Sequence, residues 1–218
     1  GNYVWSGGTN YMPDAPPAPP APTPPSGGEY EFDEAASFNK GRPQKPFAIV
    51  MHTTVGSFNG TRAHFNNPAS QVSAHYVIGL DGRILQMVRE DDTAFHAGTV
   101  DRPTWKLYNG KNPNGYTIGI EHVDDGNPTL VRPDAQYAAS AKLVRSICLR
   151  YGIPIDRDHI VRHNEIRKSK SCPGSLDLDK IISMINSASA PAPTPPAPPS
   201  NPVPVIEQTA MVKASDFD

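Results

Sequence analysis

The stretch "PFAIVMHTT" (residues 46–54) is a short apolar run composed of residues that favour strands. Such a run without polar alternation is typical of a strand that is buried on both faces of a sheet. The run carries a histidine, His52, at its end. A buried imidazole is costly unless it is hydrogen-bonded or bound to something. The run therefore predicts a strand buried on both faces, with a histidine at its end that needs a partner.

Further strands are predicted on the C-terminal side of this run. Residues 72–88, "VSAHYVIGLDGRILQMV", read as two strands around Asp81-Gly82, which is a strong hairpin signal. Residues 115–123, "GYTIGIEHV", predict another strand.

Helices are predicted mainly after the strands. The clearest one covers residues 132–152, with Pro133 suited to its first turn and Gly152 at its end. A shorter helix is expected around residues 60–68. Strands followed by long helices indicate an α/β domain with a central mixed β-sheet flanked by helices. A second long helix is expected over residues 175–187, with an inner face made of Leu176, Ile181, Met184 and Ile185.

Two proline-rich runs bound this domain. Eight of fifteen positions are proline in residues 11–25, and eight of fifteen again in residues 190–204. Proline runs form neither helix nor sheet and favour extended, semi-rigid spacers. An SH3-type ligand is the alternative, but Ala and Thr fillers without flanking arginine favour a spacer. We expect a tail and spacer over residues 1–28, one folded domain over 29–187, and a spacer and tail over 188–218.

Composition excludes several classes of function. The 218-residue chain has a net charge of -2 and a pI near 6.4, so it lacks the basic excess that nucleic-acid binding requires. No apolar run approaches the roughly 20 residues that span a bilayer. No signal peptide is visible, and the chain begins with Gly1 rather than Met, so we expect it to be processed or cut from something longer.

The two cysteines differ in context. Cys148 falls on the apolar stripe of the long helix and reads as a small buried hydrophobe. Cys172 lies in "RHNEIRKSKSCPG" (162–174), close to His163 and a Pro-Gly turn. Cys172 could form a disulfide, have a packing role or bind a metal. A single disulfide would be a sparse framework for a domain of this size.

A metal site would draw on residues far apart in the sequence. His163 follows a second apolar stretch, and strand ends are where side chains converge in α/β folds. Zinc suits imidazole and thiolate together, and three protein ligands leave one position for water. The alternative is that His52 and His163 are hydrogen-bonded core residues and Cys172 a turn residue. Spacing does not decide between these, because no HExxH or CxxC signature is present.

Five segments carry a further signal because of their order: "FAIVMHTT", "VSAHYVIGLDGRI", "TAFHAG", "YTIGIEHVDDG" and "VRHNEIRKSKSCPG". Together they resemble the zinc amidase family, which includes N-acetylmuramoyl-L-alanine amidases, T7-type lysozymes and peptidoglycan recognition proteins. The likeness runs from about residue 46 to residue 187.

The resemblance implies roles for particular residues. The family's zinc ligands fall on His52, His163 and Cys172, and its lysine shortly before the last ligand falls on Lys170. Glu121 matches a glutamate that some members carry in the "GIE" strand. The catalytic tyrosine of T7-type members is replaced here by Ala74, which shifts proton transfer to Glu121.

The resemblance implies catalytic roles for Glu121 and Lys170. Glu121 is expected to move the proton of a zinc-activated water, and Lys170 to stabilise the oxyanion. Strand alternation puts Glu121 on one face with Thr117 and Gly119. His96, in "TAFHAG", resembles a position that lines the substrate groove, with a structural hydrogen bond as the alternative.

The activity implied is zinc-dependent hydrolysis of the amide between N-acetylmuramic acid and L-alanine of peptidoglycan. The alternatives are a module that binds peptidoglycan without cutting it and a structural component of a phage tail. The expected setting is the cell wall or outside of the cell, or delivery by a phage, as an endolysin, a virion lysin or an autolysin. Partner modules of the phage or cell wall are expected through the proline-rich tails.

Overall fold

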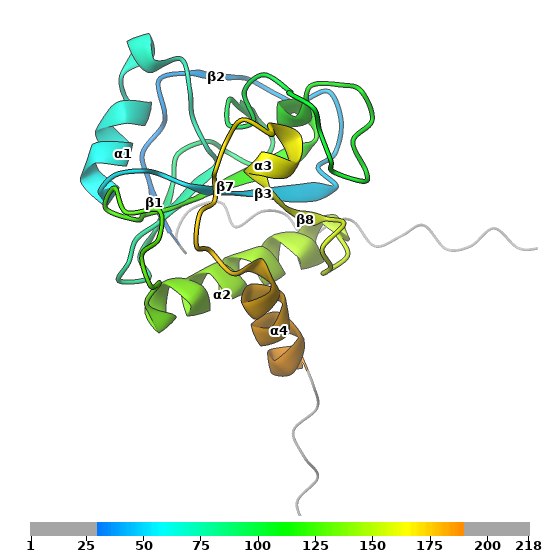
Figure 1. Cartoon of the computed structure of the whole chain (residues 1–218). Coiled ribbons are helices and arrows are strands. Elements are labelled where there is room, and N and C mark those ends of the chain that lie inside the picture. The colour runs from blue at the N-terminus through cyan, green and yellow to red at the C-terminus, as the bar shows by residue number, and fades with distance from the viewer. Residues whose placement is uncertain (1–29, 190–218) are drawn as a thin grey trace, which may run out of the picture.

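A six-stranded mixed sheet forms the centre of the computed structural model, which describes residues 30–189 (Figure 1). The proline-rich runs lie outside the described residues. A two-stranded sheet pairs β2 (Phe38–Asn39) with β6 (Thr93–Ala94). The main sheet has the order β1-β5-β4-β7-β3-β8, with bounds β1 Glu31–Phe32, β3 Ala48–Thr53, β4 Tyr76–Ile78, β5 Ile84–Gln86, β7 Thr117–His122 and β8 Ile160–Arg162.

The burial of β3 confirms the prediction made from its sequence. All six of its residues are buried, and it pairs in parallel with β7 on one side and β8 on the other. The hairpin is also confirmed, because β4 and β5 are antiparallel around Asp81-Gly82. Gly82 has φ +84°, and a Cβ there would lie 2.8 Å from the carbonyl oxygen of Ala135, so glycine is required at this turn.

Alternation along β3 divides the domain into layers. Ile49 and Met51 face the helices α2 and α4, whereas Ala48 and Val50 face the opposite side. His52 has the parity of Val50 and so lies on that opposite side. Figure 1 shows α2 and α4 below the sheet and α1 and α3 above it. The helices are α1 Phe58–Phe65, α2 Asp134–Tyr151, α3 His163–Ile166 and α4 Leu178–Ser189, with short 3₁₀ turns at Pro68–Ser70 and Pro113–Gly115.

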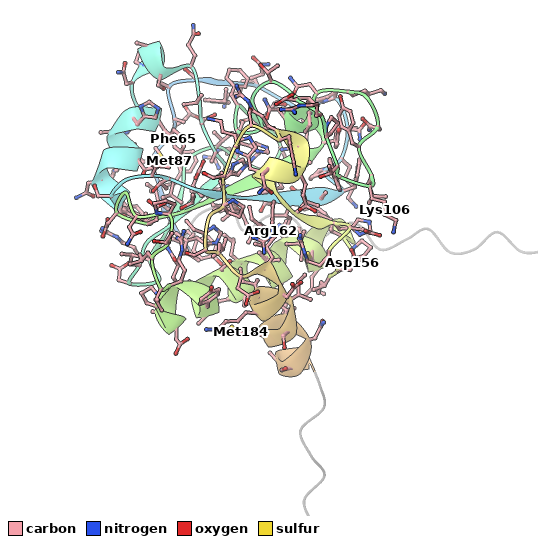
Figure 2. All side chains as sticks on the ribbon, viewed as in Figure 1. Phe65, Met87, Lys106, Asp156, Arg162 and Met184 are labelled. Carbon is pink, nitrogen blue, oxygen red and sulfur yellow. The ribbon has the colours of Figure 1, made fainter. Side chains whose placement is uncertain are left out.

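The long helices follow the predicted pattern with small shifts. Helix α2 ends at Gly152, whose φ is +69°, but Pro133 is the N-cap of the helix instead of a member of its first turn. Ile181 and Ile185 of α4 are buried against α2, whereas Met184 is only partly buried (Figure 2). On the other side of the sheet, Phe65 of α1 and Met87 share a second apolar cluster. None of the helices within residues 30–189 has the length and apolar character to span a bilayer.

Candidate metal centre

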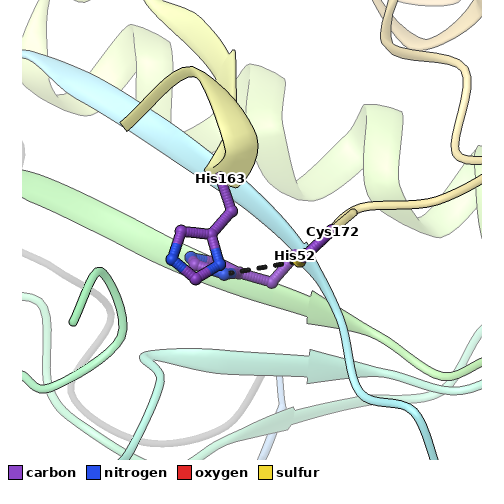
Figure 3. Close-up of side chains that lie close together, drawn as sticks. All are labelled: His52, His163 and Cys172. Carbon is purple, nitrogen blue, oxygen red and sulfur yellow. Dashed lines mark hydrogen bonds between the residues drawn. The ribbon is translucent and has the colours of Figure 1, made fainter. Parts of the chain in front are cut away.

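Three side chains from distant parts of the sequence meet at one end of the sheet. His52 lies near the end of β3, His163 directly follows β8, and Cys172 lies in the loop before α4. They converge because β3 and β8 are neighbouring parallel strands, whose carboxyl ends share one edge of the sheet. One donor atom from each residue lies within 4.8 Å of the others (Figure 3).

The donor set fits zinc. His52 Nδ1 lies 3.8 Å from Cys172 Sγ. Tetrahedral zinc with ordinary bond lengths places a nitrogen and a sulfur ligand roughly 3.6 Å apart. Two imidazoles and one thiolate are also ligands that zinc prefers, and they leave a fourth position open.

Backbone contacts hold Cys172 in place. The amide N–H of Thr53 donates a hydrogen bond to Cys172 Sγ at 3.1 Å, which suits a thiolate. The amide N–H of Asn164 donates to the carbonyl oxygen of Cys172 at 3.0 Å. Both cysteines are free, and Cys148 is buried in α2, so the disulfide considered from the sequence does not form.

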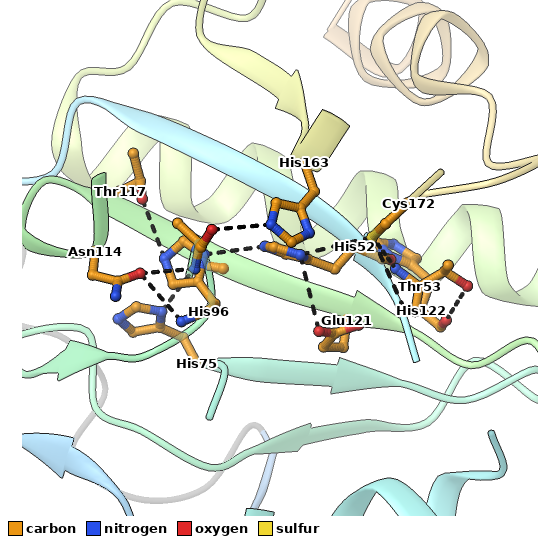
Figure 4. A network of polar contacts seen from close by, with 12 residues as sticks. His52, Thr53, His75, His96, Asn114, Thr117, Glu121, His122, His163 and Cys172 are labelled. Carbon is orange, nitrogen blue, oxygen red and sulfur yellow. Dashed lines mark hydrogen bonds and ion pairs between the residues drawn. The ribbon is translucent and has the colours of Figure 1, made fainter. Parts of the chain in front are cut away.

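Each imidazole has one nitrogen engaged and the other directed at the cluster. His163 Nε2 bonds the carbonyl oxygen of Ala97 at 3.0 Å, and His52 Nε2 bonds His96 Nδ1 at 3.0 Å (Figure 4). The Nδ1 atoms of His52 and His163 are therefore the ones available to a metal. Burial lowers the pKa of His163 and holds the pKa of His52 well below its usual value, so both imidazoles are neutral ligands at pH 7.

Glu121 lies beside the cluster, directly opposite His52 in the β3–β7 register. Its Oε1 is 4.0 Å from His52 Nδ1, and its side chain is 14% exposed. Its Oε2 is buried without a hydrogen-bond partner among the described residues. Burial, reinforced by Asp124 and opposed by Lys170, raises the pKa of Glu121 to about 8. Burial also raises the pKa of the Cys172 thiol. Burial thus disfavours the anionic form of both groups, and a cation bound beside them would favour it.

A buried polar network holds the end of β3 and the loop that follows it. Asp124 accepts hydrogen bonds from the Thr53 hydroxyl at 2.6 Å and from the Gly56 amide at 3.1 Å. Arg132 donates to the Thr53 hydroxyl at 2.9 Å. Asp124 and Arg132 are both buried, so their charges compensate each other and fix the loop that follows His52.

A cavity of about 740 Å³ opens over the cluster. Helix α1 and the loop after β3 form part of its wall, and Val55 and Val72 line it with partly exposed apolar side chains. Lys170 also lines it and is exposed to solvent. The cavity brings together His52, His96, Glu121, His163, Lys170 and Cys172.

Val55 adopts a strained backbone conformation at this cavity. Its φ is +53°, and its side chain is 67% exposed. The left-handed region costs a residue with a Cβ roughly 1–2 kcal/mol, and asparagine occupies it more readily than a β-branched residue. We expect Val55→Asn to raise the free energy of unfolding by about 1 kcal/mol in urea denaturation. Val55→Ile keeps the strain and should leave stability unchanged. Equal stability of all three proteins would contradict the prediction.

Comparison with known proteins agrees with this geometry. The model of the protein family described as N-acetylmuramoyl-L-alanine amidase matches residues 42–175, which is more than half of the chain. The chain belongs to the N-acetylmuramoyl-L-alanine amidase family. It is 46% identical over 111 residues to N-acetylmuramoyl-L-alanine amidase A of Achromobacter lyticus, covering 49% of this chain and 53% of that protein. It is 34% identical over 122 residues to the 1,6-anhydro-N-acetylmuramyl-L-alanine amidase AmpD of Citrobacter freundii, covering 55% and 60%.

Solved structures of amidases share the fold. The crystal structure of an AmpD derivative superposes with a TM-score of 0.61 at 26% identity, covering 72% of this chain and 94% of that one. The amidase AmiD from E. coli, in complex with the substrate anhydro-N-acetylmuramic acid-L-Ala-D-gamma-Glu-L-Lys, gives 0.54 at 26% identity, covering 63% and 56%. The chain spans a little over half the length of the curated relatives it matches.

In this member of the family, the structure brings the predicted site residues together around one cavity. For His96 the structure shows hydrogen bonds of the kind that the sequence analysis gave as the alternative to substrate contact. Both of its ring nitrogens are engaged within the protein, with His52 and with the Thr117 hydroxyl, so its predicted contact with substrate remains a prediction. No pattern in the sequence indicated the support from Asp124 and Arg132.

Proposed function

We propose that the protein is a zinc-dependent N-acetylmuramoyl-L-alanine amidase, which hydrolyses the amide between N-acetylmuramic acid and L-alanine of peptidoglycan. The observation that carries the proposal is the convergence of His52, His163 and Cys172 beside a buried carboxylate at the base of an open cavity. Membership of the amidase family and the muropeptide bound to AmiD support the choice of substrate.

Zinc would be held by the Nδ1 atoms of His52 and His163 and by the Cys172 thiolate. When bound, zinc supplies a Lewis acid that activates water and polarises the scissile carbonyl. The ionised form of Glu121, which burial disfavours, would be favoured by the positive charge of the bound ion.

Glu121 is the proposed proton carrier. Amide hydrolysis forms a bond from the water oxygen to the carbonyl carbon and breaks the bond from that carbon to nitrogen. The departing amine needs a proton, and the attacking water must lose one. Glu121 lines the cavity, and one of its oxygens has no hydrogen-bond partner among the described residues. Its carboxylate therefore takes the proton that the water loses and delivers it to the departing nitrogen.

Lys170 is the proposed electrostatic partner of the reacting carbonyl. It lines the cavity next to Cys172, and its positive charge opposes the rise in the pKa of Glu121. A cation at this position stabilises negative charge that develops on the carbonyl oxygen. The substrate contact predicted for His96, which lines the same cavity, would be made by its ring carbon atoms, because both ring nitrogens are engaged within the protein.

Product analysis tests the activity. Purified peptidoglycan is digested with the protein and the soluble fragments are examined by mass spectrometry. We expect free stem peptides that carry L-alanine at their amino ends. New reducing sugars in their place would indicate a glycosidase. Retention on peptidoglycan without released peptide would indicate a binding module.

We propose further that the enzyme acts at the cell wall, as a phage lysin or a bacterial autolysin. The two proline-rich runs support this setting, because semi-rigid spacers suit a catalytic domain that is linked to other modules. Partner modules of the phage or cell wall would be attached through these runs.

A further inference from the structure

One two-residue segment, His96–Ala97, contacts both candidate ligand histidines. The side chain of His96 bonds His52, and the carbonyl oxygen of Ala97 bonds His163, each over 3.0 Å. We propose that this segment is the positioning device of the metal centre, which holds both imidazoles with Nδ1 directed at the ion. The inference rests on the proposed zinc site.

The hydrogen bonds around His96 fix the direction in which each proton points. The Thr117 hydroxyl donates to the carbonyl oxygen of Pro113 at 2.7 Å. Its oxygen is then the acceptor for His96 Nε2, 3.2 Å away. A neutral imidazole has one donor and one acceptor nitrogen, so His96 Nδ1 must accept from His52 Nε2. This assignment leaves the lone pair of His52 on Nδ1, toward Cys172.

The segment itself is rigidly held. The Asn114 side-chain oxygen accepts from the backbone amides of His96 and Ala97, at 3.2 and 2.8 Å. The ring of His96 packs on Gly119 of β7, where an added Cβ would lie 2.3 Å from His96 Cγ. Strand β7 therefore needs glycine at this position so that the ring can lie against it. Outer contacts of this kind commonly set ligand orientation and are worth about 10- to 100-fold in metal affinity.

Three variants separate positioning from a merely structural role. His96→Leu removes the acceptor for His52. His96→Asn places a side-chain oxygen near the former Nδ1 and should restore much of the effect. Thr117→Val keeps the volume of the side chain and removes the hydroxyl, which frees His96 to change tautomer. His75→Leu is the control, because His75 is also buried and lies against the ring of His96, but it bonds the Gly119 amide and not His52.

Two measurements are made on the full chain. Competition with a chromophoric chelator gives the zinc dissociation constant, and long-range ¹H–¹⁵N NMR of the metal-free protein gives the tautomer of His52. We expect wild-type His52 to carry its proton on Nε2. His96→Leu should weaken zinc binding about 10- to 100-fold, Thr117→Val should weaken it less, and His75→Leu should leave it unchanged even if stability falls.

Zinc affinities within twofold of wild type in folded His96→Leu and Thr117→Val would overturn the inference. A proton on Nδ1 of wild-type His52 would also overturn it. If the wild-type protein bound no zinc, the proposed metal site would fall, while the NMR result would still decide whether His96 sets the tautomer of His52. Failure of the inference and failure of the proposed function are thus distinguishable.

Discussion

Replacing Cys172 with alanine should lower the affinity for zinc by roughly a thousandfold and abolish amidase activity. Protein zinc sites bind with about 12 kcal/mol, and an equal share for each of three ligands is about 4 kcal/mol, which is roughly three orders of magnitude. Cys172 would provide the anionic ligand, and the two histidines that remain are neutral. Metal analysis of the purified protein should find about one zinc per chain in wild type and little in the variant.

Cys148→Ala is the matched control for this experiment. It removes the same thiol from the buried face of α2, which packs on the side of the sheet opposite His52, so zinc content should be unchanged. Cys172→Asp should recover part of the metal, because a carboxylate oxygen is also a zinc ligand. Full zinc occupancy in Cys172→Ala would show that residues other than Cys172 hold the ion.

Replacing Glu121 with glutamine should reduce kcat by about 10²- to 10⁴-fold while zinc content stays near that of wild type. Glutamine has nearly the same shape but cannot accept and return a proton at neutral pH. The loss should appear in kcat more than in KM. The carboxylate is proposed to act on the proton that is transferred in the transition state, and no contact with the substrate in the ground state is proposed for it.

The measurement is the rate of stem-peptide release at saturating peptidoglycan, together with metal analysis of the same sample. Glu34→Gln makes the same chemical change at an exposed position and should leave both values unchanged. Activity within threefold of wild type in zinc-loaded Glu121→Gln would remove Glu121 as the proton carrier.

Much of the fold could be predicted because its decisive signals are local. The unbroken apolar run at residues 46–54 indicated a strand buried on both sides, and β3 is paired on both sides. The Asp81-Gly82 turn and the helix ended by Gly152 depend on residues close together in sequence. Short elements without apolar periodicity, such as β8 and the single turn of α3, gave too little signal to be assigned.

The candidate site was predictable only in part. Residue types and the family resemblance indicated His52, His163, Cys172 and Glu121, and alternation put Glu121 on one face of its strand. The surroundings of His96 were not predictable, since 44 positions separate it from His52 in their hydrogen bond. No local pattern encodes a pair that far apart.

The sequence by itself determined the order of the longer strands and helices, the alternation along β7, and the chemical types of the site residues. These follow from preferences that act within a few residues of the chain. Only the tertiary structure decided that the carboxyl ends of β3 and β8 meet, and that Cys172 and Glu121 face one imidazole. It also decided which nitrogen of each histidine is free. Such contacts depend on strand register and loop path, which are set by the packing of the whole domain.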